Sequence, residues 1–82
     1  MGARPPKEVL GKIREAAKSV KSVKKFKDIR AHYVGDRVHV ELSIVLSKNL
    51  KTKKAHDIGE QVQKAVENVA LVSYAFVHID YE

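Results

Sequence analysis

The stretch FKDIRAHYVGDRVHVELSIVL, Phe26–Leu46, contains the pattern from which the fold of this 82-residue chain can be predicted. Its apolar residues recur mostly at two-residue spacing on both sides of Gly35-Asp36. Such alternation is typical of two strands, and Gly-Asp is suited to the tight turn of a hairpin. A two-residue loop would place Tyr33 opposite Val38 on the buried side of this hairpin.

The same register predicts which polar residues face each other on the other side of the hairpin. The pairs are His32 with His39, Arg30 with Glu41, and Asp28 with Ser43. The opposite charges of the Arg30–Glu41 pair support this register, because directly opposed residues of neighbouring strands interact.

Amphipathic helices are predicted on either side of the hairpin. The first apolar stripe, at three- and four-residue spacing, comprises Val9, Leu10, Ile13, Ala16, Ala17 and Val20. Pro6 fits its first turn, where a missing N–H is tolerated. The second stripe comprises Ala55, Ile58, Val62, Ala65, Val66 and Val69, with Thr52 as the expected N-cap.

A last strand is expected from about Val72 to Tyr81, so the order of elements is α-β-β-α-β. The outward face of this strand would carry Tyr74, Phe76, His78 and Asp80. Two helices on one face of a three-stranded sheet make a two-layer α+β domain. We therefore predict one domain over residues 1–82, with residues 1–6 as a short flexible lead-in.

Composition narrows the possible functions. Residues 1–54 carry 15 Lys/Arg against 5 Asp/Glu, whereas residues 55–82 carry one Lys against 5 acids. This basic front half indicates either a polyanionic neighbour, such as nucleic acid or an anionic membrane leaflet, or simply a solvated lysine-rich surface. The chain has no cysteine and no apolar run of the roughly 20 residues that a membrane span needs.

Catalysis and sequence-specific RNA binding are poorly supported. The chain lacks a thiol nucleophile, a nucleophile elbow and a glycine-rich phosphate loop, so we do not expect an enzyme. A dense lysine run from Lys18 to Lys27 favours a nucleic-acid partner. However, only Tyr74 and Phe76 would stand on the open face of the last strand, and they do not match an RRM signature.

The histidines offer more specific chemistry. His78 and Asp80 lie two residues apart and share one strand face, and His56 lies in the first turn of the second helix. Two imidazoles and a carboxylate are a suitable ligand set for Zn²⁺ or another divalent transition metal. His32 and His39 could also share an ion near the hairpin tip, although a solvated surface pair is the commoner arrangement for two such residues.

Taken in order, several segments resemble one known domain. They are PPKEVLGKIREAAKSV as the entry helix, the hairpin FKDIRAHYVGDRVHVELSIVLSKNL, AHDIGEQVQKAV as the second helix, and FVHID as the closing strand. Over nearly its full length the chain resembles the cytosolic C-terminal domain of the cation diffusion facilitator family, the divalent-metal/proton antiporters. The resemblance implies a metallochaperone-like, ferredoxin-like variant of the α+β fold.

The resemblance also implies a function. Domains of this family pair as homodimers below the membrane portion of the transporter, and bound metal stabilises the closed dimer and so regulates transport. We therefore expect a regulatory, non-catalytic domain on the cytoplasmic side of the cell membrane, near the anionic inner leaflet. The alternative is a free-standing small metal- or RNA-binding module of the same fold.

The family's ligands correspond to His56, His78 and Asp80 here. Two further family histidines are replaced, by Lys27 and by Ser43. The resemblance therefore implies a site reduced from the family's two-metal cluster to one ion, with water or a group from the partner chain completing it. Lys27 would supply the positive charge of the missing second ion.

Overall fold

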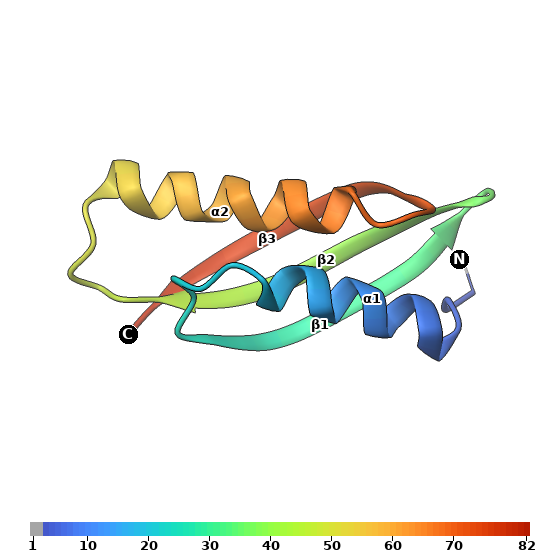
Figure 1. Ribbon diagram of the computed structural model, residues 1–82, viewed down its shortest axis with the longest axis horizontal. Helices are drawn as coiled ribbons and strands as arrows, with labels where there is room; N and C mark the ends of the chain where they lie inside the picture. The colour runs from blue at the N-terminus through green and yellow to red at the C-terminus, as the bar shows by residue number, and fades with distance from the viewer. Residues whose placement is uncertain (1–2) are drawn as a thin grey trace.

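The computed structural model describes residues 3–82 as one sheet with two helices. The elements are α1 (Lys7–Lys18), β1 (Lys25–Val34), β2 (Arg37–Leu46), α2 (Thr52–Glu67) and β3 (Val72–Tyr81). Both helices lie on the same face of the sheet, and the other face is left open (Figure 1). The predicted α-β-β-α-β order and two-layer α+β architecture are therefore confirmed.

The sheet has the strand order β1-β2-β3, with β1 antiparallel and β3 parallel to the central β2. The predicted hairpin register is confirmed at every pair given above. Gly35 has φ 66°, a left-handed conformation that glycine adopts without the steric cost of a side chain. Its place as the first residue of the two-residue loop matches the type II′ preference for glycine there.

One residue of β1 departs from the predicted alternation. Phe26 pairs with Ile44 and Asp28 with Ser43, so Lys27 is an extra residue without a partner on β2. Such a β-bulge bends the strand locally and changes where side chains point. Here the Lys27 side chain reaches across the open face as far as β3, where it contacts Asp80.

The core fills the space between the helices and the sheet. Its buried side chains come from every element: Ile13, Ala17, Ala31, Val38, Val40, Leu42, Ile44, Leu46, Ala55, Ile58, Val62, Val66, Val72 and Ala75. α2 approaches the sheet so closely at Gly59 that a β-carbon there would lie 2.9 Å from Cδ1 of Ile79. This close approach positions the first turns of α2 against the end of β3.

Both predicted helix starts require correction by one position. The Lys51 carbonyl accepts the first helical hydrogen bond, from the Ala55 N–H at 3.0 Å, so Lys51 rather than Thr52 is the N-cap of α2. Likewise Pro6 is the N-cap of α1 instead of part of its first turn, and its carbonyl accepts the Leu10 N–H at 3.1 Å. Within the predicted lead-in, the Ala3 carbonyl accepts the Tyr33 N–H at 2.8 Å; residues 1 and 2 lie outside the described part.

Candidate metal site on the open face of the sheet

The open face of the sheet carries rows of side chains that run across all three strands. From the hairpin end, the rows are His32–His39–Tyr74, Arg30–Glu41–Phe76, Asp28–Ser43–His78 and Lys25–Val45–Asp80. Because successive residues of a strand alternate between faces, these side chains share the face that the helices leave uncovered. The predicted outward positions of β3 are thereby confirmed.

Two of the three predicted ligands lie together on this face. The Nε2 atom of His78 is 3.4 Å from Oδ1 of Asp80. The other carboxylate oxygen, Oδ2, is 3.3 Å from Nζ of Lys27. Asp80 therefore joins a cation on β1 to an imidazole on its own strand, and both contacts are partly open to solvent.

A second ion pair runs parallel to the first and covers an apolar residue. Lys25 Nζ lies 3.2 Å from Oε2 of Glu82, so it too crosses from β1 to the end of β3. Val45 of β2 is paired with Lys25 on one side and Asp80 on the other, and only 1% of its surface is exposed. We attribute this burial on a face without helices to the aliphatic stems of the lysines, which cover Val45 while their ammonium groups reach the acids.

The third predicted ligand, His56, lies elsewhere. It projects from α2 on the helix-covered side, where its Nδ1 is 3.4 Å from Oε1 of Glu60. It borders a hollow of about 210 Å³ between α2 and β3. His78 stands on the opposite face of the sheet, so within one chain the edge strand separates the two imidazoles. Among residues 3–82, no three His, Cys, Asp or Glu side chains are close enough to hold an ion together.

The His78–Asp80 pair nevertheless fits a metal ion in chemistry and in spacing. Two donors that share a tetrahedral zinc ion lie about 3.3–3.5 Å apart when each bond is about 2.0–2.1 Å. The observed 3.4 Å falls in this range. What one chain lacks is the number of donors, since a structural zinc site has four ligands and even a catalytic one keeps three from the protein.

Two features near this site were not predicted from the sequence. The bulge at Lys27 was signalled by the three-residue step from Phe26 to Ile29, which breaks the two-residue period. Glu67 carried no such signal. Its Oε2 accepts a hydrogen bond from the Ala75 N–H at 3.1 Å, so this backbone donor on the outer edge of β3 is not free to pair with another strand.

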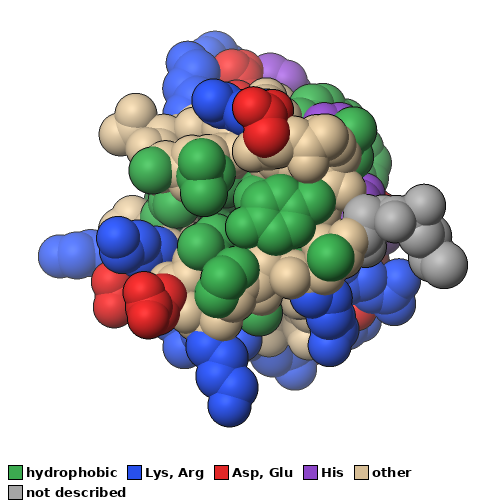
Figure 2. All heavy atoms as spheres, turned by 90° about the vertical axis from the view of Figure 1, so that its right-hand side faces the viewer, with side chains coloured by type: hydrophobic (Ala, Val, Ile, Leu, Met, Phe, Trp, Pro, Cys, Tyr) green, Lys and Arg blue, Asp and Glu red, His purple; other side chains and the backbone are tan. Residues whose placement is uncertain are grey.

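The end of the molecule that holds the hairpin loop has a different character. Apolar side chains gather at its centre, and Lys and Arg side chains stand around them with several Asp and Glu side chains among them (Figure 2). Val34 and Leu71, both close to half exposed, are among the exposed apolar residues of the chain. No helix within residues 3–82 combines the length and apolar character needed to cross a membrane.

Comparison with known proteins identifies the class to which this fold and face belong. Residues 5–82 match the family model described as "Cation efflux protein, cytoplasmic domain". The chain belongs to this family, as the cytoplasmic domain of a cation efflux protein, and the predicted resemblance is confirmed.

Individual relatives agree with this assignment. The chain is 40% identical over 79 residues to an uncharacterized transporter of Methanocaldococcus jannaschii, covering 96% of this chain and 28% of that protein. It is 42% identical over 60 residues to metal tolerance protein 10 of Arabidopsis thaliana, covering 73% of this chain and 14% of that protein. The chain thus spans less than a third of these curated relatives.

Solved structures share the whole fold. The MamM CTD in a nickel form superposes with a TM-score of 0.85 at 28% identity, covering 94% of this chain and 99% of that one. A cadmium form of the MamM CTD gives a TM-score of 0.84 at 30% identity, covering 93% and 96%. The similarity therefore extends over the complete α-β-β-α-β unit and confirms the predicted metallochaperone-like fold.

Proposed function

We propose that this domain regulates a divalent-cation efflux transporter by binding Zn²⁺ at His78 and Asp80, and that the bound ion stabilises a closed homodimer. The observation that carries the proposal is the 3.4 Å separation of His78 Nε2 and Asp80 Oδ1 on an exposed sheet face. The domain takes no part in catalysis. Its work is to link the concentration of metal to the geometry of the dimer.

The donors support Zn²⁺ as the bound ion. An imidazole and a carboxylate suit Zn²⁺ and neighbouring late transition metals, whereas Mn²⁺ and Mg²⁺ prefer sets of oxygen atoms. One relative, with 27% identity, is the manganese efflux system protein MneS of Bacillus subtilis. On the basis of the donors we propose Zn²⁺ as the ion bound here, whereas the MneS relative would suggest Mn²⁺. Competition between Zn²⁺ and Mn²⁺ distinguishes the two ions.

Dimerisation would supply the missing donor. β3 is an edge strand, and past Ala75 its outer edge meets no other strand of the described sheet. Phe76, half exposed, adds apolar surface next to the site. We propose a two-fold axis placed so that His56 of each copy meets the β3 edge of the other; in such an isologous contact both copies use the same residues. The ion would then be held by His78 and Asp80 of one copy together with His56 of the other copy, and water would take the remaining position.

The contact of Lys27 with Asp80 supports a site for one ion. Its ammonium lies 3.3 Å from Oδ2 of Asp80, the oxygen that faces away from His78. A carboxylate that bridges two cations has both oxygens neutralised by positive charge. Lys27 supplies one of these charges from the protein itself, so the site is reduced to a single ion.

The surface at the hairpin-loop end of the domain supports a proposal for which end faces the membrane. The apolar centre, with Lys and Arg side chains and several acidic ones around it, lies at the end where residues 3–6 enter α1 (Figures 1 and 2). Basic residues close to a membrane are attracted to anionic lipids of the inner leaflet. We propose that this end faces the transmembrane portion and the leaflet, with the His78–Asp80 site at the distant end.

Thermal unfolding with and without Zn²⁺ tests the proposal. Zn²⁺ binding to the folded state should raise the Tm of the wild-type chain, and His78→Ala should lose most of this increase. Asp36→Asn, a change in the exposed hairpin loop, is the control and should retain it. If the wild-type Tm does not respond to Zn²⁺ while the chain is retained on RNA or heparin, the free-standing RNA-binding alternative replaces this proposal.

A further inference from the structure

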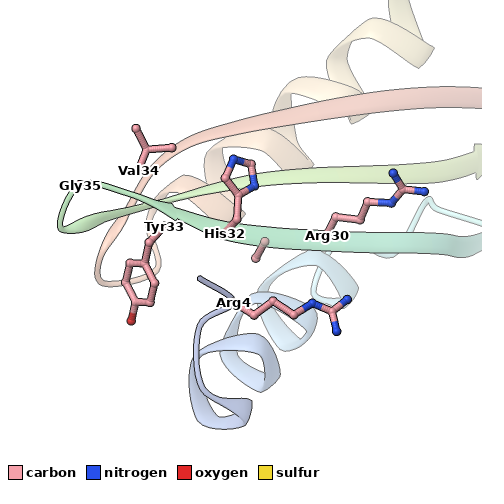
Figure 3. A pocket seen from close by; sticks show the side chains of 7 residues that line it. Arg4, Arg30, His32, Tyr33, Val34 and Gly35 are labelled. Atoms are coloured by element: carbon pink, nitrogen blue, oxygen red, sulfur yellow. The ribbon is translucent and has the colours of Figure 1, made fainter. Parts of the chain in front are cut away.

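We infer that His32 and His39 form a second binding site for a transition-metal ion such as Zn²⁺ or Ni²⁺. His32 lies on β1 and His39 on β2, directly opposite each other on the open face. Their ring centroids are 6.1 Å apart. His32 projects from β1 on the side opposite Tyr33, and so away from α1 (Figure 3).

The separation of the two rings is within reach of one shared ion. An imidazole centroid lies about 3.2 Å from a zinc ion held at the usual Zn–N bond length, so two rings on a tetrahedral ion have centroids about 5.2 Å apart. The observed 6.1 Å exceeds this by less than an ångström. A small rotation of the His32 side chain, which is exposed, would close that gap.

Tyr74 holds one of the two rings in place. Its ring centroid lies 5.4 Å from that of His39, at a tilt of 52°, and it comes from β3 on the far side of the central strand. A ring whose rotamer is already restricted loses less conformational freedom when it binds an ion. His39 is therefore the pre-oriented ligand, and His32 is the more exposed one that moves.

The residues around the pair and its imidazole donors both bear on which ions it would bind. On the same face, Arg37 lies one row towards the loop, and Arg30 and Glu41 lie one row away from it. The Nε atom of Arg30 is 3.2 Å from Oδ2 of Asp28, so that guanidinium is directed to a partner in the next row. Two imidazoles favour late transition metals over Mg²⁺ or Mn²⁺. Because the pair supplies only two protein donors, water would complete the coordination of the ion.

The pair is separate from the site proposed above. His39 and Ser43, the β2 partner of His78, are four residues apart on one strand, which is roughly 13 Å at 3.3 Å per residue. One ion cannot bridge that distance. A site on the hairpin would also join β1 to β2 instead of joining two copies of the chain, so its failure and that of the regulatory site are distinguishable.

Imidazole nitrogen resonances measured by NMR during a Zn²⁺ titration test the inference, because each histidine reports for itself. The ring nitrogens of His32 and His39 should shift together, with one common half-saturation concentration. Mg²⁺ at the same concentrations should leave both unchanged. His78 reports the regulatory site independently, so its response shows whether the proposed function holds regardless of what the pair does.

Substitution separates a shared ion from two single-ligand contacts. His39→Gln should raise the Zn²⁺ concentration needed to shift His32 by about tenfold or more, since even loss of a supporting group around a metal ligand commonly costs about 10–100-fold. Asp36→Asn, in the adjoining loop, is the control and should leave the titration unchanged. An unchanged His32 titration in His39→Gln, or different half-saturation points in the wild type, would overturn the inference. Amide spectra of each variant verify that the hairpin is intact.

Discussion

The Asp80 carboxylate lies between the Lys27 ammonium and the His78 imidazole, 3.3 Å from the first and 3.4 Å from the second. Lys27 comes from a bulge in β1, and His78 and Asp80 come from the last residues of β3; these two strands are the opposite edges of the sheet. Because their side chains are partly exposed, the contacts contribute little to folding, typically about 0–1 kcal/mol per surface ion pair. These groups are therefore available for the metal binding proposed above at little cost in stability.

Asp80→Asn separates these two roles. The substitution removes the negative charge but preserves the size of the side chain, so we expect the free energy of unfolding to fall by no more than about 1 kcal/mol. Zn²⁺ affinity measured by calorimetry should decrease at least about tenfold, since a neutral amide is a poor zinc ligand. Glu41→Gln removes a carboxylate from the same face and serves as the matched control. Equal losses of affinity in both variants would show that net charge, not Asp80 itself, binds the ion.

Lys27→His should increase the number of ions bound. The substitution places an imidazole at the bulge position whose present side chain already reaches Asp80. A second donor set then becomes available around the same carboxylate, and the positive charge of the lysine no longer competes with an ion. Calorimetric stoichiometry should rise by up to one ion per chain over that of the wild type, with Lys24→His as the control on a neighbouring exposed lysine. No increase in Lys27→His would contradict the view that Lys27 replaces a second ion.

Gly59 and Ile79 should be energetically coupled. Alanine in place of a helical glycine normally stabilises a helix by roughly 0.5–1 kcal/mol. Here the new β-carbon would lie 2.9 Å from Cδ1 of Ile79, so part of that gain is lost to repacking. Ile79→Val removes this atom. We expect a double-mutant cycle, measured by urea unfolding, to show this coupling. The change that Gly59→Ala makes in the free energy of unfolding should be more favourable in the Ile79→Val background than in the wild type, by at least about 0.5 kcal/mol. Strict additivity would show that α2 and β3 are less closely packed than described.

Leu71 has a φ of 76°, the one positive value outside glycine in residues 3–82. The left-handed region costs an ordinary side chain roughly 1–2 kcal/mol. Leu71→Gly should therefore be more stable than Leu71→Ala by about 1 kcal/mol, although alanine is usually the more stabilising of the two. The two variants differ only by the β-carbon, at a residue that is 44% exposed, so thermal unfolding of the pair reports mainly the backbone conformation. An alanine variant of equal or higher Tm would contradict this strain.

The hairpin register could be predicted from sequence because it depends on local rules. A two-residue loop with glycine fixes which residues face each other, and the Arg30–Glu41 pair then follows. The bulge at Lys27 was less accessible, since a single three-residue step is weak evidence against a run of alternating residues. It is nevertheless this bulge that brings Lys27 to Asp80.

The relation of His56 to His78 was beyond prediction from one chain. Periodicity places His56 on α2 and His78 on the outward face of β3, but it does not say that the sheet edge lies between them. The resemblance grouped these residues as ligands of one site, and within residues 3–82 they do not meet around one ion. A site shared between two copies is compatible with both facts, which makes the oligomeric state the decisive question.

Sedimentation velocity of the chain with and without equimolar Zn²⁺ tests this central claim most directly. We predict that Zn²⁺ shifts the wild-type chain towards a more compact or more populated dimer, seen as an increase in sedimentation coefficient. His56→Ala and His78→Ala should each abolish the shift, whereas Asp36→Asn should preserve it. A Zn²⁺-independent sedimentation coefficient, or a shift that persists in His78→Ala, would contradict metal-linked dimerisation at this site.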